Sequence, residues 1–232
     1  HYLFTLIFSL LFSLSYSQIS ELPHTTSFEA VSDLGTTATD ALSKWTSATS
    51  GTVNGESFAS QIAFTVNEGL EGPSFGFTTS STNAWYTGPN GAQDGNNYIF
   101  VESTGSDFSK AELAAIYNFN DYEDVQINFK AHNFSNNYAL GYTSYWDFAN
   151  YLGPASAKLY IYDPSVTVPG PDNNGWSLAW EYTTNSQNWA DITIDLSAYD
   201  GLNNVQFWFA IYTANVSHSS AWQSDFALDN IS

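Results

Sequence analysis

The sequence contains no cysteine, no methionine and no arginine. The absence of cysteine excludes disulfides, zinc sites built from thiolates, and catalysis or redox chemistry by a thiol. Stability must therefore come from an apolar core, with or without the help of a bound metal ion.

Positive charge is also scarce. Four lysines face 23 acidic residues, and the formal net charge is -19. A field of this sign repels phosphate backbones, so nucleic acids are not expected as partners. The same field attracts cations, calcium included.

The residues that are abundant favour β structure. The chain has 232 residues, of which 43% are hydrophobic and 17% aromatic, while only 12% are charged. Many large flat side chains among Ser, Thr and Asn are typical of strands and turns. A chain of this length can bury a sizeable core in one or two domains.

The first residues resemble a secretory signal peptide. An apolar run covers residues 3–14, and Ser15 and Ser17 provide the small residues that a signal peptidase reads. We expect cleavage after Ser17, a polar leader over residues 18–27, and the folded domain from residue 28 to 232. Since methionine is absent, we also expect residues before His1, and further sequence after Ser232. The predicted location is secreted or at the cell surface, with no membrane span in the mature segment.

Alternating apolar and polar residues predict many short strands separated by turns. The plainest cases are residues 191–196 and 205–212; in the latter, Val205, Phe207, Phe209 and Ile211 share one face. Such a pattern predicts an all-β fold, an antiparallel β-sandwich of the jelly-roll type. The other expected strands are 28–30, a short one near Trp45, 59–66, 98–102, 111–117, 125–131, 158–162, 177–182 and 225–231.

The order of these elements resembles the MAM domain, an extracellular jelly-roll module with two sheets. The resemblance runs from Phe28 to Ile231 and rests on several short motifs. They are Phe28-Glu29, Trp45, Thr87-Gly88-Pro89, Asp94-Gly95, residues 98–102, Ala111-Glu112-Leu113, the strand that ends at Phe129, residues 157–161, Trp189 with the strand 192–196, and Ala227-Leu228-Asp229-Asn230-Ile231. The chain departs from the family in its lack of cysteine, in Asn230 and Gly95 where the family has Asp and His, and in an enlarged aromatic segment over residues 135–154.

The resemblance implies a structural calcium site. Glu29, Asp94 and Asp229 would converge where the first and last strands meet, and Asp225 could add an oxygen. Calcium takes six to eight oxygen ligands from carboxylates and carbonyls, so these residue types suit a Ca2+ ion. The alternative is that they are separate surface acids, which are common in so acidic a chain.

Two groups of aromatic residues are candidates for ligand binding. Tyr142, Tyr145, Trp146 and Tyr151 crowd one loop, and Trp208 lies on the strand face opposite Phe207. Exposed aromatic rings stack on the apolar faces of sugars and are common in protein interfaces. The alternative is burial, since a sandwich covers one face of each strand with core and a long loop can cover the other.

Nothing in the sequence predicts an active site. Acidic residues occur in pairs, such as Asp191 and Asp195, but on an outward strand face, and the four histidines are scattered. The leading hypothesis is a non-catalytic recognition module for adhesion or protein–protein interaction, stabilised by calcium, whose partner is an extracellular protein or glycan. The alternative is a carbohydrate-binding appendage, or a spacer, of a secreted hydrolase or peptidase.

Overall fold

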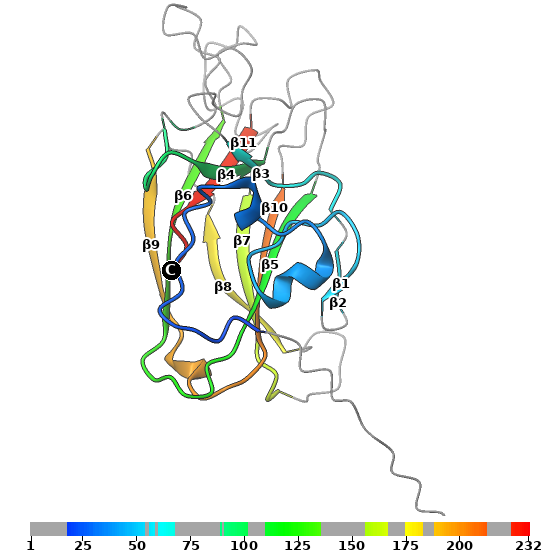
Figure 1. Ribbon diagram of the computed structural model, residues 1–232, viewed down its shortest axis with the longest axis vertical. Helices are drawn as coiled ribbons and strands as arrows, with labels where there is room; N and C mark the ends of the chain where they lie inside the picture. The colour runs from blue at the N-terminus through cyan, green and yellow to red at the C-terminus, as the bar shows by residue number, and fades with distance from the viewer. Residues whose placement is uncertain are drawn as a thin grey trace, which may run out of the picture.

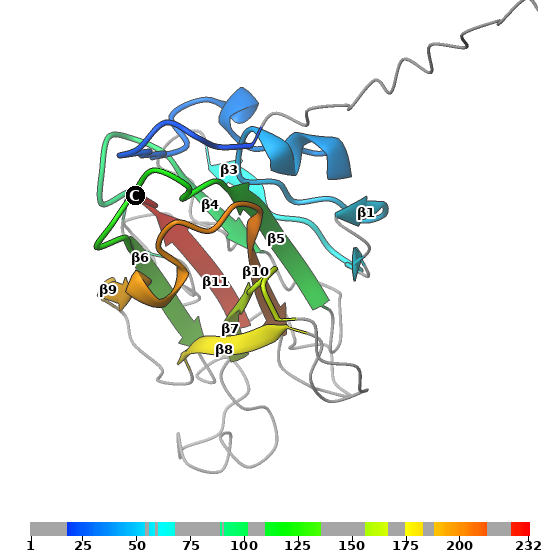
Figure 2. The ribbon, with the colours of Figure 1, turned by 90° about the horizontal axis from the view of Figure 1, so that it is seen from below.

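The computed structural model describes residues 18–53, 56–58, 60–67, 89, 91–101, 110–135, 156–166, 175–182, 188–212 and 224–232. Two antiparallel sheets face each other across a single apolar core, so the predicted antiparallel β-sandwich is confirmed (Figures 1 and 2). Among the described residues, no helix is both long and apolar enough to cross a bilayer.

The first sheet has four strands in the order β5 (Lys110–Tyr117), β10 (Val205–Tyr212), β7 (Ser156–Tyr162) and β8 (Trp176–Tyr182). The second has five, in the order β3 (Thr65–Asn67), β4 (Tyr98–Val101), β11 (Ser224–Asp229), β6 (Gln126–Ser135) and β9 (Ala190–Asp195). A small hairpin of β1 (Thr52–Val53) and β2 (Glu56–Ser57) lies beside β5. Short 3-10 turns are η1 (Val31–Asp33), η2 (Ala38–Leu42) and η4 (Ser197–Tyr199).

Strand β10 is central to its sheet, and its predicted core face is confirmed. Val205, Phe207, Phe209 and Ile211 are buried between the sheets. Trp45 packs against the rings of both phenylalanines, with centroids 6.0 Å and 5.5 Å away. Burying each large side chain here contributes roughly 1.5–3 kcal/mol to folding.

The other face of β10 is also buried, which the alternation alone does not predict. Residues Gly35 to Phe58 cross the outside of β5 and β10 and place η2, β1 and β2 there (Figure 1). Together with outward side chains of β5 and β10 they form a second apolar cluster on this side. Its members are Ala41, Ala48, Val53, Phe58, Ala114, Ile116, Trp208 and Ala210. We call this side of the sheet the covered half of its outer face.

Several expectations about the first third of the chain are wrong. Residues 28–30 form no strand, because Phe28 adopts a φ of 55° and turns the chain. Of the expected strand over residues 59–66, the structure describes residues 60–66, and among these only Thr65 and Val66 lie in a strand, β3. Near Trp45 there is an isolated bridge from Thr46 to Ala114 in place of a strand.

Residues 18–27 are part of the sandwich rather than a leader ahead of it. The Ile19 N–H donates to the Ile116 carbonyl at 3.1 Å, and the Ile19 side chain is buried in the core. Thr26 and Ile231 exchange two backbone hydrogen bonds of 2.9 Å. The two ends of the described chain are therefore paired directly. The expected signal peptide, residues 1–17, lies outside the described residues.

Candidate functional site

The structure brings two of the expected metal ligands to one short segment, residues 93–97. The Asp229 carboxylate is fully buried and accepts backbone N–H bonds from Gln93 at 2.7 Å, Asp94 at 3.0 Å and Asn230 at 2.7 Å. Burial raises the pKa of Asp229, and these N–H donors oppose that shift. Asp229 thus holds the segment before β4 against the end of β11.

Glu29 holds the same segment from its other side. Its carboxylate accepts the N–H groups of Asn96 at 3.0 Å and Asn97 at 3.2 Å, and the Asn97 side chain donates to the Glu29 carbonyl at 2.7 Å. Gly95 has a φ of +64°, and a Cβ there would lie 2.2 Å from a Glu29 oxygen. Glycine is favoured at this position by both the backbone and the Glu29 carboxylate.

In this structure the carboxylates of Glu29 and Asp229 face backbone N–H donors. Calcium requires oxygen atoms facing one point, whereas the N–H groups of residues 93–97 face both carboxylates. Asp94 is exposed at the surface, and Asp225 is buried on β11. In the described part of the chain no three His, Cys, Asp or Glu side chains form a group that could hold a metal. Calcium binding stays a prediction, and the carboxylates of Glu29 and Asp229 act as hydrogen-bond acceptors.

The outer face of the five-stranded sheet is closed in its middle. Tyr98 and His132 are buried there, and the Trp189 ring lies edge-on to both, with centroids 5.7 Å and 5.6 Å away. Asn67 donates to the Tyr98 hydroxyl at 2.7 Å. Burial, reinforced by the charges of Asp225 and Asp229, raises the pKa of Tyr98 to about 12. Phe100, whose ring centroid lies 6.2 Å from that of Tyr98, and Trp189 are half-buried, so this face carries a smaller and less exposed aromatic group.

The aromatic residues predicted to bind ligand are only partly described. Tyr142, Tyr145, Trp146 and Tyr151 lie outside the described residues. Trp208 is only 7% exposed, because the Phe58 ring lies over it at a centroid distance of 4.7 Å. The burial alternative therefore holds for Trp208, which belongs to the covered half.

An open aromatic surface lies beside it, on β7 and β8. Tyr162 pairs with Trp176, and Tyr160 pairs with Leu178, so the four side chains form a two-by-two patch on the outer face of the sheet. Leu178 is 51% exposed, and the three aromatic residues are half-buried. The Trp176 ring lies 5.4 Å from the Tyr162 ring and 6.1 Å from the Trp208 ring. We call this patch the β7–β8 platform.

A β-bulge creates the platform. Leu159 pairs with Trp180 but Tyr160 pairs with Leu178, so Ala179 is the extra residue on β8. A bulge of this kind shifts which side chains face each side of a sheet. Trp176 and Leu178 therefore point outward, while Trp180 points inward and packs edge-on against Phe129 at 5.1 Å. Simple alternation would put all three on one face, which is why the sequence did not reveal this surface.

An ion pair borders the platform. Lys158 and Glu181 are cross-strand partners, and their charged atoms lie 3.2 Å apart. Both side chains are partly exposed, so the pair presents donors and acceptors to solvent next to the rings. A half-exposed apolar patch with polar groups at its margin can bind a flat amphipathic ligand.

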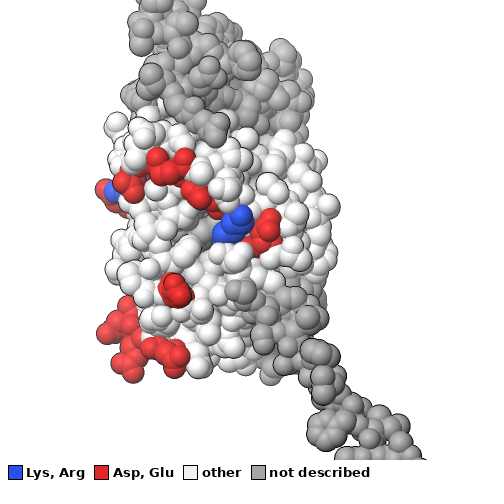
Figure 3. Space-filling model, in the orientation of Figure 1, with Lys and Arg blue, Asp and Glu red and all other residues white. Residues whose placement is uncertain are grey.

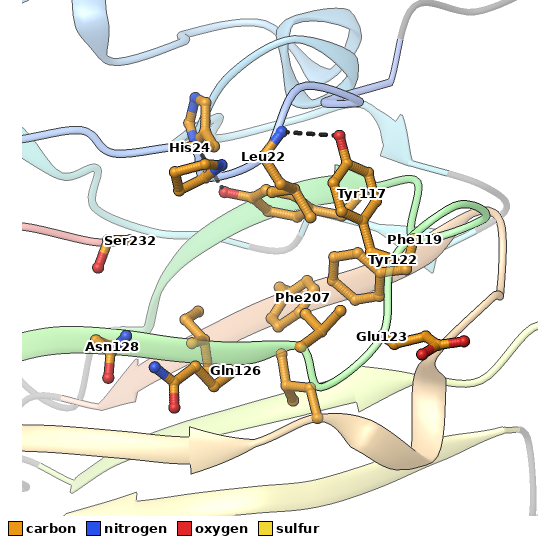
Figure 4. Close-up of a pocket in the computed structure, with 14 residues that line it drawn as sticks. Leu22, His24, Tyr117, Phe119, Tyr122, Glu123, Gln126, Asn128, Phe207 and Ser232 are labelled. Carbon is orange, nitrogen blue, oxygen red and sulfur yellow. Dashed lines mark hydrogen bonds between the residues drawn. The ribbon is translucent and has the colours of Figure 1, made fainter.

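A separate pocket lies where the N-terminal segment crosses the end of the sandwich (Figure 4). It measures about 300 Å³ and has mainly apolar walls. Its lining residues are Leu22, Pro23, His24, Tyr117, Phe119, Tyr122, Glu123, Val125, Gln126, Ile127, Asn128, Leu196, Phe207 and Ser232.

Three polar side chains of this pocket, those of His24, Tyr117 and Tyr122, already form hydrogen bonds. The Tyr122 hydroxyl accepts the Leu22 N–H and donates to the Ser20 carbonyl, both at 3.1 Å, and the His24 ring lies 3.1 Å from the Tyr117 hydroxyl (Figure 4). Burial lowers the pKa of His24 and raises that of Tyr117. These bonds fix residues 20–24 across the end of the sandwich.

No protein-family model and no curated protein matches the chain. Among solved structures, it is similar to the K1 adhesin domain of Lys-gingipain from Porphyromonas gingivalis W83, with 15% identity, a TM-score of 0.45, and coverage of 90% of this chain and 95% of that chain. It is also similar to the CBM22-2 xylan-binding domain of Xyn10C from Paenibacillus barcinonensis, with 10% identity, a TM-score of 0.40, and coverage of 90% and 96%.

A third similar structure is a carbohydrate-binding module, TmCBM27, solved in a study of mannan recognition. It has 11% identity and a TM-score of 0.38, and the match covers 90% of this chain and 93% of that chain. At these values the similarities assign neither a ligand nor an activity to this chain. The MAM resemblance stays a prediction.

Proposed function

We propose that the protein is a non-catalytic carbohydrate-binding module, and that sugars bind on the β7–β8 platform. The observation that carries this proposal is the open patch of Tyr160, Tyr162, Trp176 and Leu178. Large apolar side chains are usually buried, whereas Leu178 is 51% exposed and the three aromatic side chains around it are partly exposed; contiguous groups of this kind are typical of binding surfaces.

The chemistry of the platform suits a sugar better than a purely apolar partner. Sugar rings have apolar faces and hydroxyl edges. The rings of Trp176 and Tyr162 offer an apolar surface, while Lys158 and Glu181 beside them can exchange hydrogen bonds with hydroxyl groups. The platform thus favours the carbohydrate-binding alternative over the adhesion hypothesis. A location outside the cell, where polysaccharides are met, is part of the proposal.

The test is affinity electrophoresis in gels that contain soluble polysaccharides, followed by calorimetry on those that retard the protein. Wild type should be retarded by at least one polysaccharide. Trp176→Ala should weaken that binding by about tenfold or more, which corresponds to about 1.4 kcal/mol of binding free energy.

Val31→Ala is the matched control. Val31 is 55% exposed on η1, outside the platform, and is the other large hydrophobic side chain exposed among the described residues. It should bind as wild type does. Equal binding by Trp176→Ala and wild type would contradict the proposal. Self-association or capture of a protein, without binding to any polysaccharide, would support the adhesion hypothesis instead.

A further inference from the structure

The four cations of the chain are all engaged within the structure. Lys110, Lys130 and Lys158 form ion pairs with Glu112, Asp191 and Glu181. Lys44 donates to the Ser32 carbonyl at 2.7 Å. Arginine, which commonly binds a carboxylate or sulfate through two parallel hydrogen bonds, is absent from the sequence.

The cation nearest the platform is compensated by its own neighbour. The Lys158 ammonium donates to the Glu181 carboxylate, and that hydrogen bond is the main reason why the pKa of Lys158 is raised. An acidic group on a ligand would have to displace the Glu181 carboxylate from Lys158 or lie beside it. Since like charges at short range repel, either position is unfavourable.

The wider field acts in the same direction. The chain carries 23 acidic residues against four lysines, and on the face drawn in Figure 3 acidic side chains gather in several groups while basic ones occupy small spots. A net charge of -19 lowers the local concentration of anions and the rate at which they arrive.

We propose that the β7–β8 platform selects uncharged or amine-bearing glycans and rejects acidic ones such as uronates and sulfated polymers. This proposal rests on the proposed carbohydrate-binding function and adds the chemical class of the ligand. Binding to an uncharged glycan is carried by stacking and hydroxyl hydrogen bonds, so it should depend little on salt. Rejection of acidic glycans is electrostatic, and salt should weaken it.

The first experiment measures binding to three polymers, namely mannan (uncharged), chitosan (amine-bearing) and polygalacturonate (acidic), in about 20 and about 200 mM salt. Mannan should bind with a Kd that changes less than about twofold between the two salt concentrations. Chitosan should bind more tightly at low salt, and polygalacturonate should bind at least about tenfold more weakly than mannan there.

The second experiment releases Lys158. In Glu181→Gln the ammonium loses its carboxylate partner, so affinity for polygalacturonate at low salt should rise by about five- to tenfold while affinity for mannan changes little. Glu123→Gln is the matched control, because it changes the net charge equally at an exposed position on a different part of the surface. It should leave both affinities within about twofold of wild type.

The outcomes separate this inference from the proposed function. Equal binding of mannan and polygalacturonate, both lost in Trp176→Ala, would overturn the selection by charge and leave the carbohydrate-binding function standing. Identical behaviour of Glu181→Gln and Glu123→Gln would overturn the role of the Lys158–Glu181 pair. Binding to none of a broad set of glycans would overturn the proposed function itself.

Discussion

The two halves of one sheet face carry similar side chains and have different fates. Over β5 and β10, Trp208 is 7% exposed because Phe58 and the turns around η2 lie on it. Over β7 and β8, the outward side chains stay at the surface, and Leu178 is 51% exposed. Yet Trp208 and Trp176 touch each other, with ring centroids 6.1 Å apart. The boundary between core and platform thus falls between two adjacent tryptophans.

The difference between the halves comes from a distant part of the chain. The outer face of β10 is covered by described residues between 35 and 58, which are far away in sequence. No described segment crosses β7 and β8. The local pattern of each strand does not distinguish the two situations. An aromatic residue on an outward strand face is therefore core or binding surface according to what lies over it.

The largest expected effect is on stability, in the covered half. Trp208→Ala should lower the free energy of unfolding by about 3–5 kcal/mol, because it leaves a cavity beneath Phe58. Trp176→Ala, on the open half, should cost less, about 1–2 kcal/mol, since part of the Trp176 side chain already faces solvent. Urea unfolding monitored by circular dichroism measures both. Equal losses would show that the two halves are not different in kind.

A smaller effect is expected at the segment that Asp229 holds. Asp229→Ala removes the acceptor of the Gln93 and Asp94 N–H groups, so the free energy of unfolding should fall by about 1–3 kcal/mol. Glycan binding should not change, because Asp229 lies on the other sheet. Parallel calorimetry and urea unfolding measure the two quantities, and a loss of binding without a loss of stability would contradict the comparison.

The same site is where the expected calcium would act. Excess chelator should lower the thermal midpoint of wild type if a cation also binds these carboxylates, since an ion that binds only the folded state stabilises it. In Asp229→Ala the chelator should then have no effect. An unchanged wild-type midpoint would leave the N–H bonds as the only interactions that hold this segment.

The smallest expected effect is on pH dependence. Burial lowers the pKa of His24 from its ordinary 6.5, so the unfolded chain takes up a proton before the folded one does. This contribution to stability is complete above pH 6.5 and is lost as the pH falls toward the lowered pKa of the folded state. His24→Gln should flatten that part of the unfolding curve against pH. Glycan binding should stay constant there, because His24 is not part of the platform.

Much of the fold could be predicted from the sequence. Most of the strands from β4 to β11 are predicted because they alternate and are bounded by turn residues, and the core face of β10 follows from its own period of two. Strand β5 does not alternate, and its Ala and Glu residues also favour a helix; it is predicted from the alternating strand that follows it. Local propensity predicts a strand at Phe28 and does not show its left-handed backbone, with a φ of 55°. The sequence pattern does not show that residues 18–27 belong to the sandwich, because Ile19 is held there by pairing with Tyr117 of β5, a contact between distant segments.

The candidate site was much less predictable. The family resemblance implies that Glu29, Asp94 and Asp229 converge on a calcium ion, which stays a prediction. The N–H groups of residues 93–97 that Glu29 and Asp229 accept depend on backbone geometry, which the sequence does not show. The platform depends on the bulge at Ala179, which leaves no clear trace in the residues of β8. Trp208 was a candidate because its strand face looked free, and a segment far away in sequence covers it.

Glycan binding on β7 and β8 can be located residue by residue. Hydroxyl-radical footprinting read by mass spectrometry makes this measurement. The protein is labelled with and without a bound polysaccharide, and oxidation is quantified at each aromatic residue. We predict that the polysaccharide protects Trp176, Tyr160 and Tyr162, while Trp208 is labelled weakly in both states. Protection confined to residues 142–151, with Trp176 labelled equally in both states, would contradict this account.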